Sequence, residues 1–331
     1  MKQQTFEFLY QKDWQQLEHA LIIAEEKRLP WQANKSALDP ELPQLYRRIC
    51  HHLSMAQERH YSSYLVAKLN DLVLRAHQQL YQRQNRFLYQ LVTFIVFRFP
   101  NQFRQNINYF WVASLLFYLP GVIVYALVIY QPQMIYSVFD HLQVLQFESM
   151  YDPTSSHYGT DRQAQTDLQM FGHYIQNNIS IGFQTFATGL FFGLGSIFYL
   201  VFNGLVFGAV SAHIVNIGYN NTFFPFVIGH GSFELTAITI AGAAGLMLGH
   251  SLINPGQYPR ALALKFAASK ALDLVYGITL MLLIAAFIEA FWSSNSALPL
   301  HIKYGVGACL WLLVFCYLAF AGKSHTIKVT P

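Results

Sequence analysis

The sequence predicts an all-α, polytopic membrane protein with about six transmembrane helices and an N-terminal helical region. Three observations support this fold class. Charged residues make up only 11% of the 331-residue chain, whereas soluble domains contain about 25%. Most of the charge lies in residues 1–105, and several apolar stretches long enough to cross a bilayer follow from residue 106 onward. The chain therefore divides into an amphipathic helical region, 1–105, and a transmembrane domain, 106–331.

Apolar residues in the N-terminal region recur at helical spacing. Within residues 41–86 they lie three or four positions apart, as in Leu65, Leu69, Leu72, Ala76 and Leu80. This period predicts amphipathic helices that pack together through their apolar faces. The stretch 86–100 is apolar but short, and it ends in Arg98 and Pro100. We therefore expect it to lie at the membrane surface or against the helical bundle, and not to span the bilayer.

The rest of the chain contains apolar stretches for six crossings, since about 20 apolar residues span the hydrocarbon layer. We place the crossings near 108–130, 176–200, 203–219, 225–251, 270–292 and 302–321. The residues FNG at 202–204 would form a tight turn between the second and third crossings. The third crossing is then short, so a broken or re-entrant helix is an alternative there.

The distribution of Lys and Arg predicts the orientation of these crossings. Six crossings place three basic segments on one side: the N-terminal region, the loop near Arg260 and the C-terminal tail. The loops 131–172 and 293–301 together contain a single Lys or Arg residue, Arg162. These two loops therefore fall on the other side of the membrane. We therefore expect a protein of the bacterial inner membrane with both termini in the cytoplasm and an extracytoplasmic loop at about 131–172.

Several function classes lack support in the sequence. The net charge of +4 is small and no basic run is interleaved with aromatic residues, so a nucleic-acid partner is not expected. The three cysteines form no CxxC motif, which argues against a zinc knuckle or a disulfide framework. Neither a phosphate-binding loop followed by lysine nor a GxSxG nucleophile elbow occurs. No catalytic residue is therefore assigned.

Glycine recurs at every fourth residue in three places within the apolar stretches. The pairs are Gly189 and Gly193, Gly204 and Gly208, and Gly245 and Gly249. Small residues at this spacing allow transmembrane helices to approach each other closely. The pairs are typical of helix packing within one chain, and association into a homo-oligomer is the alternative.

A single carboxylate interrupts a very long uncharged stretch. Glu234 is the only Asp, Glu, Lys or Arg between Asp167 and Arg260, and His230 precedes it by four residues. On a helix the two side chains project from the same face. A charged group at bilayer depth destabilises the protein by a few kcal/mol unless it is paired, hydrated or neutralised. This pair is therefore the first candidate for a functional site.

Other segments place polar residues at a similar depth, counting about 1.5 Å per residue from each midpoint. These residues are Glu289, His213, Asn177 and Asn178. Three interpretations of the polar layer remain open. It can hold helices together through hydrogen bonds, or bind or relay an ion or a proton for transport. It can also be a metal site, with His230, Glu234 and Glu289 as candidate ligands for zinc or another divalent ion.

The order of five segments resembles one known family. They are YLVAKLNDLVLRAHQQLY (64–81), RFPNQFRQN (98–106), NNISIGFQTFATGLFFGLGS (177–196), GHGSFELTAITIAGAAGLMLGHSLINPG (229–256) and AAFIEAF (285–291). Together they resemble the stage II sporulation protein M family of bacterial and archaeal membrane proteins. The family pattern matches His230, Gly231, Glu234 and Glu289, without assigning them a proven role.

This resemblance implies a multi-helix membrane protein without established catalysis. The family's namesake anchors peptidoglycan-degrading enzymes at the membrane. Longer relatives with a cytoplasmic N-terminal region tend to be encoded near MoxR-type ATPases, von Willebrand factor A-like proteins and RDD-type membrane proteins. We therefore expect a membrane scaffold or assembly factor for cell-envelope proteins, with no cofactor. The alternatives are a transporter or channel-like protein that uses the His/Glu cluster and, third, an intramembrane metal-dependent hydrolase.

Overall fold

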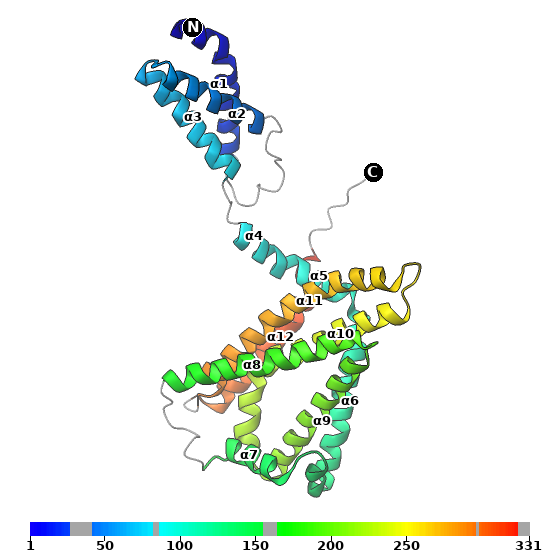
Figure 1. The fold of residues 1–331 in the computed structure, drawn as a ribbon. Helices are drawn as coiled ribbons and strands as arrows, with labels where there is room; N and C mark the ends of the chain where they lie inside the picture. Colours follow the sequence, from blue (N-terminus) through cyan, green and yellow to red (C-terminus); the bar gives the residue numbers. More distant parts are fainter. Residues whose placement is uncertain (27–41, 82–85, 155–163, 296–297, 324–331) are drawn as a thin grey trace. The chain divides into compact units, whose positions relative to one another are not determined.

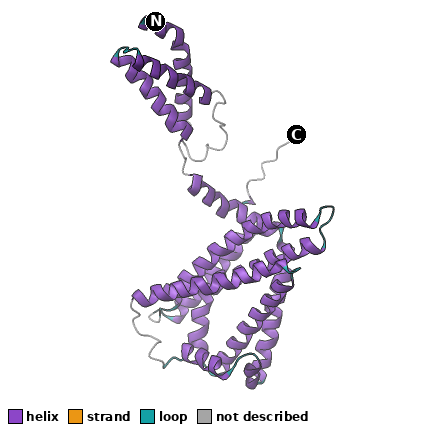
Figure 2. Cartoon of the chain, viewed as in Figure 1, coloured by secondary structure: helices purple, strands orange, loops and turns teal. Residues whose placement is uncertain are grey.

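In the computed structural model, the described residues form helices and no strand (Figures 1 and 2). The structure describes residues 1–26, 42–81, 86–154, 164–295 and 298–323. The chain divides into two compact units, Met1–Tyr89 and Gln90–Pro331. Five of the described helices are long and apolar enough to cross a membrane, and all five lie in the second unit. The predicted all-α polytopic membrane fold is confirmed.

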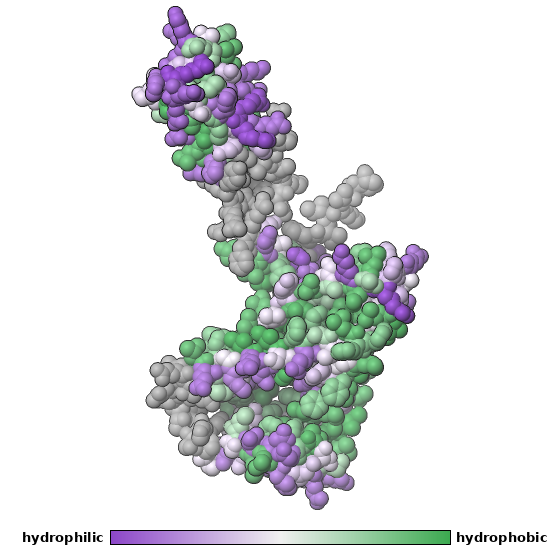
Figure 3. Space-filling model, viewed as in Figure 1, coloured by the Kyte–Doolittle hydropathy of each residue, from purple (hydrophilic) through white to green (hydrophobic). Residues whose placement is uncertain are grey.

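The first unit contains the helices α1, Gln3–Glu26, α2, Leu42–Glu58, and α3, Ser63–Tyr81. They share one apolar core, built around the side chains of Phe6, Trp14, Leu17, Ile49 and Leu69. Leu65, Leu72 and Ala76 are buried in the same core, as the helical spacing predicts, whereas the side chain of Leu80 lies outside the described residues. Hydrophilic side chains cover much of the surface of this unit (Figure 3). It therefore has the core and the surface of a small soluble domain.

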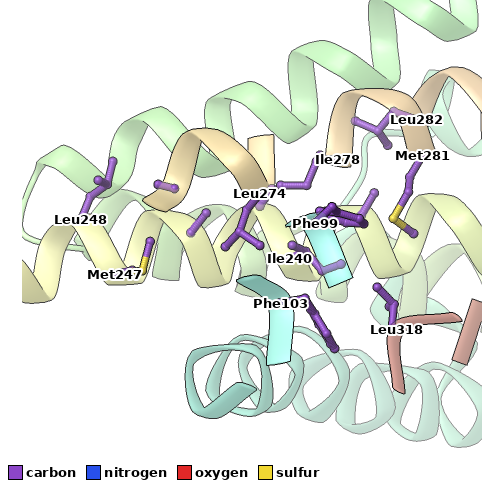
Figure 4. Packing of buried hydrophobic residues seen from close by; sticks show 14 of the residues in the cluster. Phe99, Phe103, Ile240, Met247, Leu248, Leu274, Ile278, Met281, Leu282 and Leu318 are labelled. Atoms are coloured by element: carbon purple, nitrogen blue, oxygen red, sulfur yellow. The ribbon is translucent and has the colours of Figure 1, made fainter. Parts of the chain in front are cut away.

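The second unit begins within α4, Arg86–Thr93, whose residues 88–92 are exposed. The two short helices that follow, the π-helix η1, Phe94–Arg98, and α5, Phe99–Gln105, pack against the spanning helices. The ring of Phe99 fills the space beside Gly277, and Phe103 joins the same core (Figure 4). The sequence places residues 90–105 in the N-terminal region, whereas in the structure they belong to the membrane unit. The two units therefore divide at 89/90 and not at the expected boundary, 105/106.

The spanning helices of the membrane unit run between two ends. The bounds are α6, Ile107–Tyr130; α9, Leu194–Asn216; α10, Asn220–Ile253; α11, Arg260–Ile288, which continues as the π-helix η4, Glu289–Ser293; and α12, Leu300–Phe320. At the end that carries α5, the Arg104 side chain donates a hydrogen bond to the Leu318 carbonyl oxygen over 3.0 Å. At the other end, which carries α7, His141–Tyr151, the Thr222 hydroxyl donates to the Tyr151 carbonyl oxygen over 2.6 Å. We refer to these as the α5 end and the α7 end.

Helix α8, Ala164–Ala187, is more polar than the spanning helices but runs between the same two ends. Near its start, the ring of Phe171 lies 5.5 Å from that of Phe291 in η4. Just beyond its end, Gly189 packs against Gly245 near the α5 end of α10. Helix α8 is not among the described helices that are long and apolar enough to cross a membrane, of which there are five. The expected number of about six crossings therefore stays a prediction, with α8 as the candidate for the sixth.

The predicted boundaries of the second and third crossings are wrong. Helix α8 ends at Ala187, and the chain then turns through the 3-10 helix η3, Thr188–Leu190, and through Phe192 and Gly193. Both of these residues have positive φ angles, 54° and 84°, a conformation that glycine adopts without strain. Residues 202–204, expected to form the turn, lie inside α9. Because α9 is one continuous helix of 23 residues, the alternative of a broken or re-entrant third crossing is wrong too.

The paired glycines lie at backbone contacts between helices of this unit. Gly204 and Gly208 of α9 pack directly against the backbone of Phe117 and Gly121 in α6, so that an added Cβ atom at either glycine would overlap a carbonyl oxygen. The other pairs lie where α8, the turn at 188–193 and α10 meet: Gly189 contacts Gly245, and Gly193 contacts Gly249. These contacts are all within one chain, which agrees with the packing interpretation of the glycine pairs.

The expected loop at 131–172 is largely helical in its described part. It contains the 3-10 helix η2, Pro132–Ser137, followed by α7, and α8 begins at Ala164. Residues 155–163, with Arg162, lie outside the described residues. Asp140 caps α7 by accepting a hydrogen bond from the Gln143 backbone N–H over 2.8 Å. This part of the chain therefore covers the α7 end with structure that the span pattern alone does not predict.

Candidate functional site

The histidine and the two glutamates expected at one depth form a cluster. His230 and Glu234 lie on α10, and Glu289 is the first residue of η4. One potential ligand atom from each of the three side chains lies within 4.8 Å of the other two. The Nε2 atom of His230 is 3.9 Å from the Oε2 atom of Glu234. We call these three residues the His/Glu cluster.

The π-helix η4 places two residues of the site on the face that meets α10. Glu289 and Ser293 are the first and last residues of η4, and both are buried. A π-helix has more residues per turn than an α-helix, so positions four apart lie nearly above each other. Such segments are often found at functional sites. Both residues of η4 meet α10, Glu289 in the cluster with Glu234 and Ser293 beside His230.

His230 is held by a short chain of polar contacts. Its Nδ1 atom lies 3.2 Å from the Ser293 hydroxyl. The Ser293 carbonyl oxygen accepts a hydrogen bond from the Lys303 ammonium group over 2.9 Å, and Lys303 is itself buried. Since Nδ1 faces Ser293, the Nε2 atom of His230 is the one directed towards Glu234. The ring orientation is therefore fixed by η4 and α12 together.

Glu289 is buried beside Asn178 of α8, with 9% of its surface exposed. The Oδ1 atom of Asn178 accepts a hydrogen bond from the exposed Asn177 over 3.1 Å, which directs the Asn178 Nδ2 group away from Asn177. Among the described residues, neither Glu289 Oε2 nor Asn178 Nδ2 has a hydrogen-bond partner of regular geometry. Buried polar atoms are nearly always satisfied in folded proteins. The site therefore has unused capacity to bind a polar group or an ion.

Tyr151, the last residue of α7, covers the site from the α7 end. Its ring centroid lies 4.9 Å from that of Phe223 and 6.1 Å from that of Phe226, both on α10. Burial, together with the carboxylate of Glu289, raises the pKa of the Tyr151 phenol above its ordinary value. The phenol therefore stays protonated at physiological pH and can donate a hydrogen bond to a carboxylate.

One of the residues expected in the polar layer has a different partner. His213 of α9 lies in an ion-pair contact with Glu148 of α7, with 2.8 Å between His213 Nε2 and a carboxylate oxygen of Glu148. The structure thus brings together His230, Glu234, Glu289 and Asn178, and it places Asn177 at the edge of this group. His213 belongs to a separate contact between α7 and α9.

Sequence reasoning missed four residues around these contacts: Ser293, Lys303, Tyr151 and Glu148. Two of them, Ser293 and Lys303, have sequence features that could have indicated them. Ser293 follows Glu289 by four residues, and Lys303 is a lone lysine near the start of the last span. Tyr151 and Glu148 lie on α7, so nothing in the pattern of spans could have indicated them.

The family models support an assignment of the membrane unit. Residues 113–294, more than half of the chain, match the family model described as Stage II sporulation protein M. The chain belongs to the stage II sporulation protein M family. The matched segment contains the whole His/Glu cluster, together with Tyr151, Asn178 and Ser293. The family resemblance expected from the sequence is therefore confirmed.

The first unit matches a different family. Residues 4–82 match a family described as a domain of unknown function, and this segment covers most of α1 and all of α2 and α3. No curated protein and no solved structure matches the chain. The stage II sporulation protein M family thus accounts for residues 113–294 of the membrane unit, and a second domain family accounts for residues 4–82 of the N-terminal unit.

Proposed function

We propose that this member of the stage II sporulation protein M family is an integral membrane scaffold or assembly factor for cell-envelope proteins. The observation that carries the proposal is the division into two compact units with separate cores. A soluble-type helical domain has its own family match, and it is joined in one chain to a membrane domain. Such a protein can hold a water-soluble partner at the membrane without chemistry of its own.

The surface of the first unit supports a role in protein contact. Although most of that surface is hydrophilic, the side chain of Phe8 on α1 is 84% exposed, and its neighbour Leu9 is 57% exposed. On α3, Tyr64 is exposed to a similar degree. Aromatic residues are enriched in the cores of protein interfaces, where they bury much apolar area with few rotatable bonds. Phe8 is therefore the residue that we expect to contact a partner.

The orientation and the partners belong to the same proposal. The Lys and Arg distribution supports an inner-membrane location with both termini in the cytoplasm, so that the α5 end faces the cytoplasm. The family resemblance favours MoxR-type ATPases, von Willebrand factor A-like proteins and RDD-type membrane proteins as partners. An ATPase of this kind would meet the N-terminal unit, and an RDD-type protein would meet the membrane unit within the lipid bilayer.

Site-specific photo-crosslinking in living cells tests the scaffold proposal. A photoreactive phenylalanine analogue in place of Phe8 should give a covalent adduct with a cytoplasmic protein. The same analogue in place of Phe6, which is 0% exposed, should give none. The two positions are matched in residue type and in helix, and they differ in burial. Mass spectrometry of the adduct would identify the partner.

Two outcomes would overturn the proposal. The first is equal labelling from Phe6 and Phe8, which would mean that the contacts do not depend on the exposed face. The second is the lack of any adduct from Phe8 in cells that contain the candidate partners. Labelling of a cysteine introduced at Phe8 by a membrane-impermeant thiol reagent outside intact cells would contradict the cytoplasmic location.

Transport is the second candidate function, and a specific feature of α8 favours it. This helix exposes polar side chains along one face: Gln169, His173, Gln176, Asn177, Ser180 and Gln184. A hydrophilic band follows α8 in the space-filling view (Figure 3). Polar faces at bilayer depth usually line water-filled paths or meet other polar groups. Asn177 of this face donates a hydrogen bond to Asn178, and Asn178 contacts Glu289.

A flux measurement decides whether the cluster serves transport. In liposomes containing the purified full-length protein, transport through the cluster predicts a proton or cation flux in the wild type. That flux should fall at least about tenfold in Glu234→Gln, because the variant keeps the shape of the side chain and removes its charge. The His213→Ala variant, which changes a buried histidine outside the cluster, should retain the flux. An equal flux in wild type and Glu234→Gln would exclude this function.

The third alternative, a metal-dependent hydrolase, requires a bound metal ion.

A further inference from the structure

We propose that His230, Glu234 and Glu289 form a binding site for one divalent transition-metal ion, and that zinc fits it best. The proposal does not depend on the scaffold function, since a metal ion here could act in structure or in chemistry. It follows from the donor set, from the spacing of the donor atoms, from the contact that orients the histidine, and from two buried polar atoms without partners.

The spacing of the three donors fits a metal ion after small side-chain movements. Zinc binds nitrogen and oxygen ligands at about 2.0–2.2 Å, so neighbouring ligands of a tetrahedral site lie about 3.4 Å apart. In the structure, the three ligand atoms lie within 4.8 Å of one another, and the His230 and Glu234 atoms are 3.9 Å apart. Both carboxylates end side chains that can rotate, whereas the His230 ring is oriented by Ser293, so we expect the carboxylates to close this difference.

The contact of His230 with Ser293 is typical of a metal-binding histidine. Such a residue binds the metal through one ring nitrogen, while a polar partner contacts the other and fixes the orientation of the ring. Here Nδ1 faces the Ser293 hydroxyl at 3.2 Å, and Nε2 faces the cluster. When the Nδ1–H group donates to Ser293, the Nε2 lone pair is free to bind a cation.

The hydrogen bonding of Glu289 is incomplete among the described residues. Its side chain contacts Asn178 of α8, yet Glu289 Oε2 and Asn178 Nδ2 have no hydrogen bond of regular geometry. Buried polar atoms are nearly always satisfied in folded proteins, so this contact alone leaves Glu289 able to bind a cation. Two neighbouring carboxylates within a membrane also require positive charge or protons nearby. A dication held by both would supply that charge and satisfy Glu289.

The donor set selects the class of metal. An imidazole nitrogen favours zinc and other transition metals, whereas calcium and magnesium prefer oxygen ligands alone. Three protein ligands leave a fourth position on a tetrahedral ion, which is the arrangement of zinc sites that bind water or a substrate. Glu234 retains 18% exposure of its side chain, so the site is not fully enclosed by the described residues. An ion and a small ligand can therefore enter from the Glu234 side.

Metal analysis of the full-length protein in detergent tests the site. After incubation with zinc chloride and removal of the excess, the wild type should retain one zinc ion per chain by mass spectrometry. The His230→Ala variant should bind zinc at least about tenfold more weakly, as expected for the loss of a ligand. The His213→Ala variant removes another buried histidine that contacts a carboxylate, and it should retain the ion.

A second variant keeps the test decisive if His230→Ala fails to fold. Glu289→Gln has nearly the same shape, so a monodisperse variant is expected, and it should lose most of the zinc. Cobalt in place of zinc should give the intense visible absorption of a four-coordinate site in the wild type and not in Glu289→Gln. Zinc at background level in the wild type would overturn the proposal. Equal retention in the wild type and in a folded Glu289→Gln variant would do the same.

Discussion

A valine in place of Gly208 should prevent α6 and α9 from packing and leave little folded protein in the membrane. A Cβ atom at this position would overlap the carbonyl oxygen of Gly121 in α6. The obstruction is backbone, so rotation of a side chain cannot relieve it, and the helices would have to move apart. Overpacking in well-packed interiors usually destabilises a protein by 1–3 kcal/mol, and here we expect about 3 kcal/mol or more.

The matched control for this change is Gly305→Val on α12. Gly305 is also a glycine in a spanning helix, but a Cβ atom added there would meet nothing within 4 Å. Both substitutions change helix propensity equally, so only the interhelical contact differs. Size-exclusion chromatography of detergent extracts should show a monodisperse peak for wild type and Gly305→Val, and mainly aggregate for Gly208→Val. Equal yield and equal thermal stability of the two variants would show that α6 and α9 do not pack as described.

The glycine pairs show what a sequence pattern can and cannot define. Spacing of four residues predicts close helix contacts, and the glycines lie at such contacts in the structure, but the spacing does not say which helices meet. Gly193 belongs to such a pair, but its backbone has a φ of 84° and forms the turn before α9. An apolar, glycine-rich stretch can therefore be a turn at a membrane boundary or a span. This ambiguity explains why the second and third crossings were placed wrongly.

The His/Glu cluster was predicted from scarcity of charge together with helical geometry. Glu234 stands out because so few charged residues surround it in the chain, and His230 follows from the helical period. Glu289 was added because its depth in the bilayer could be compared with that of His230. Each depth is counted from the midpoint of its own span, and this works for spans that run in opposite directions. These inferences need only regular helices of known rise per residue.

The rest of the site depends on structure that has no regular period. Ser293 follows Glu289 by four residues, a spacing visible in the sequence, but its contact with His230 depends on how η4 packs against α10, which the sequence does not show. Tyr151 and Glu148 come from α7, whose position over the α7 end follows from tertiary contacts. His213 was assigned to the cluster for the same reason, since its partner lies on α7 and not in a span.

An aspartate in place of Leu69 should unfold the N-terminal unit while the membrane unit stays folded. Leu69 is 0% exposed in the core shared by α1, α2 and α3. Loss of a buried leucine side chain alone destabilises a protein by 2–5 kcal/mol, and the variant would also bury an unpaired charge. A helical unit of this small size is marginally stable, with a free energy of unfolding of only about 5 kcal/mol. The substitution is therefore sufficient to shift the unit to its unfolded state.

Hydrogen exchange of the full-length protein in detergent distinguishes the two units. In Leu69→Asp, amides of α1, α2 and α3 should exchange at nearly the unfolded rate, whereas amides of α10 should keep their protection. The control is Leu74→Asp on the same helix, where the native side chain is 53% exposed, so the added charge stays in water. Because the membrane unit has its own core around α10 and α11, it should not respond to either change. Loss of protection in α10 of Leu69→Asp would contradict separate folding, and with it the view that a soluble domain is carried by an independent membrane anchor.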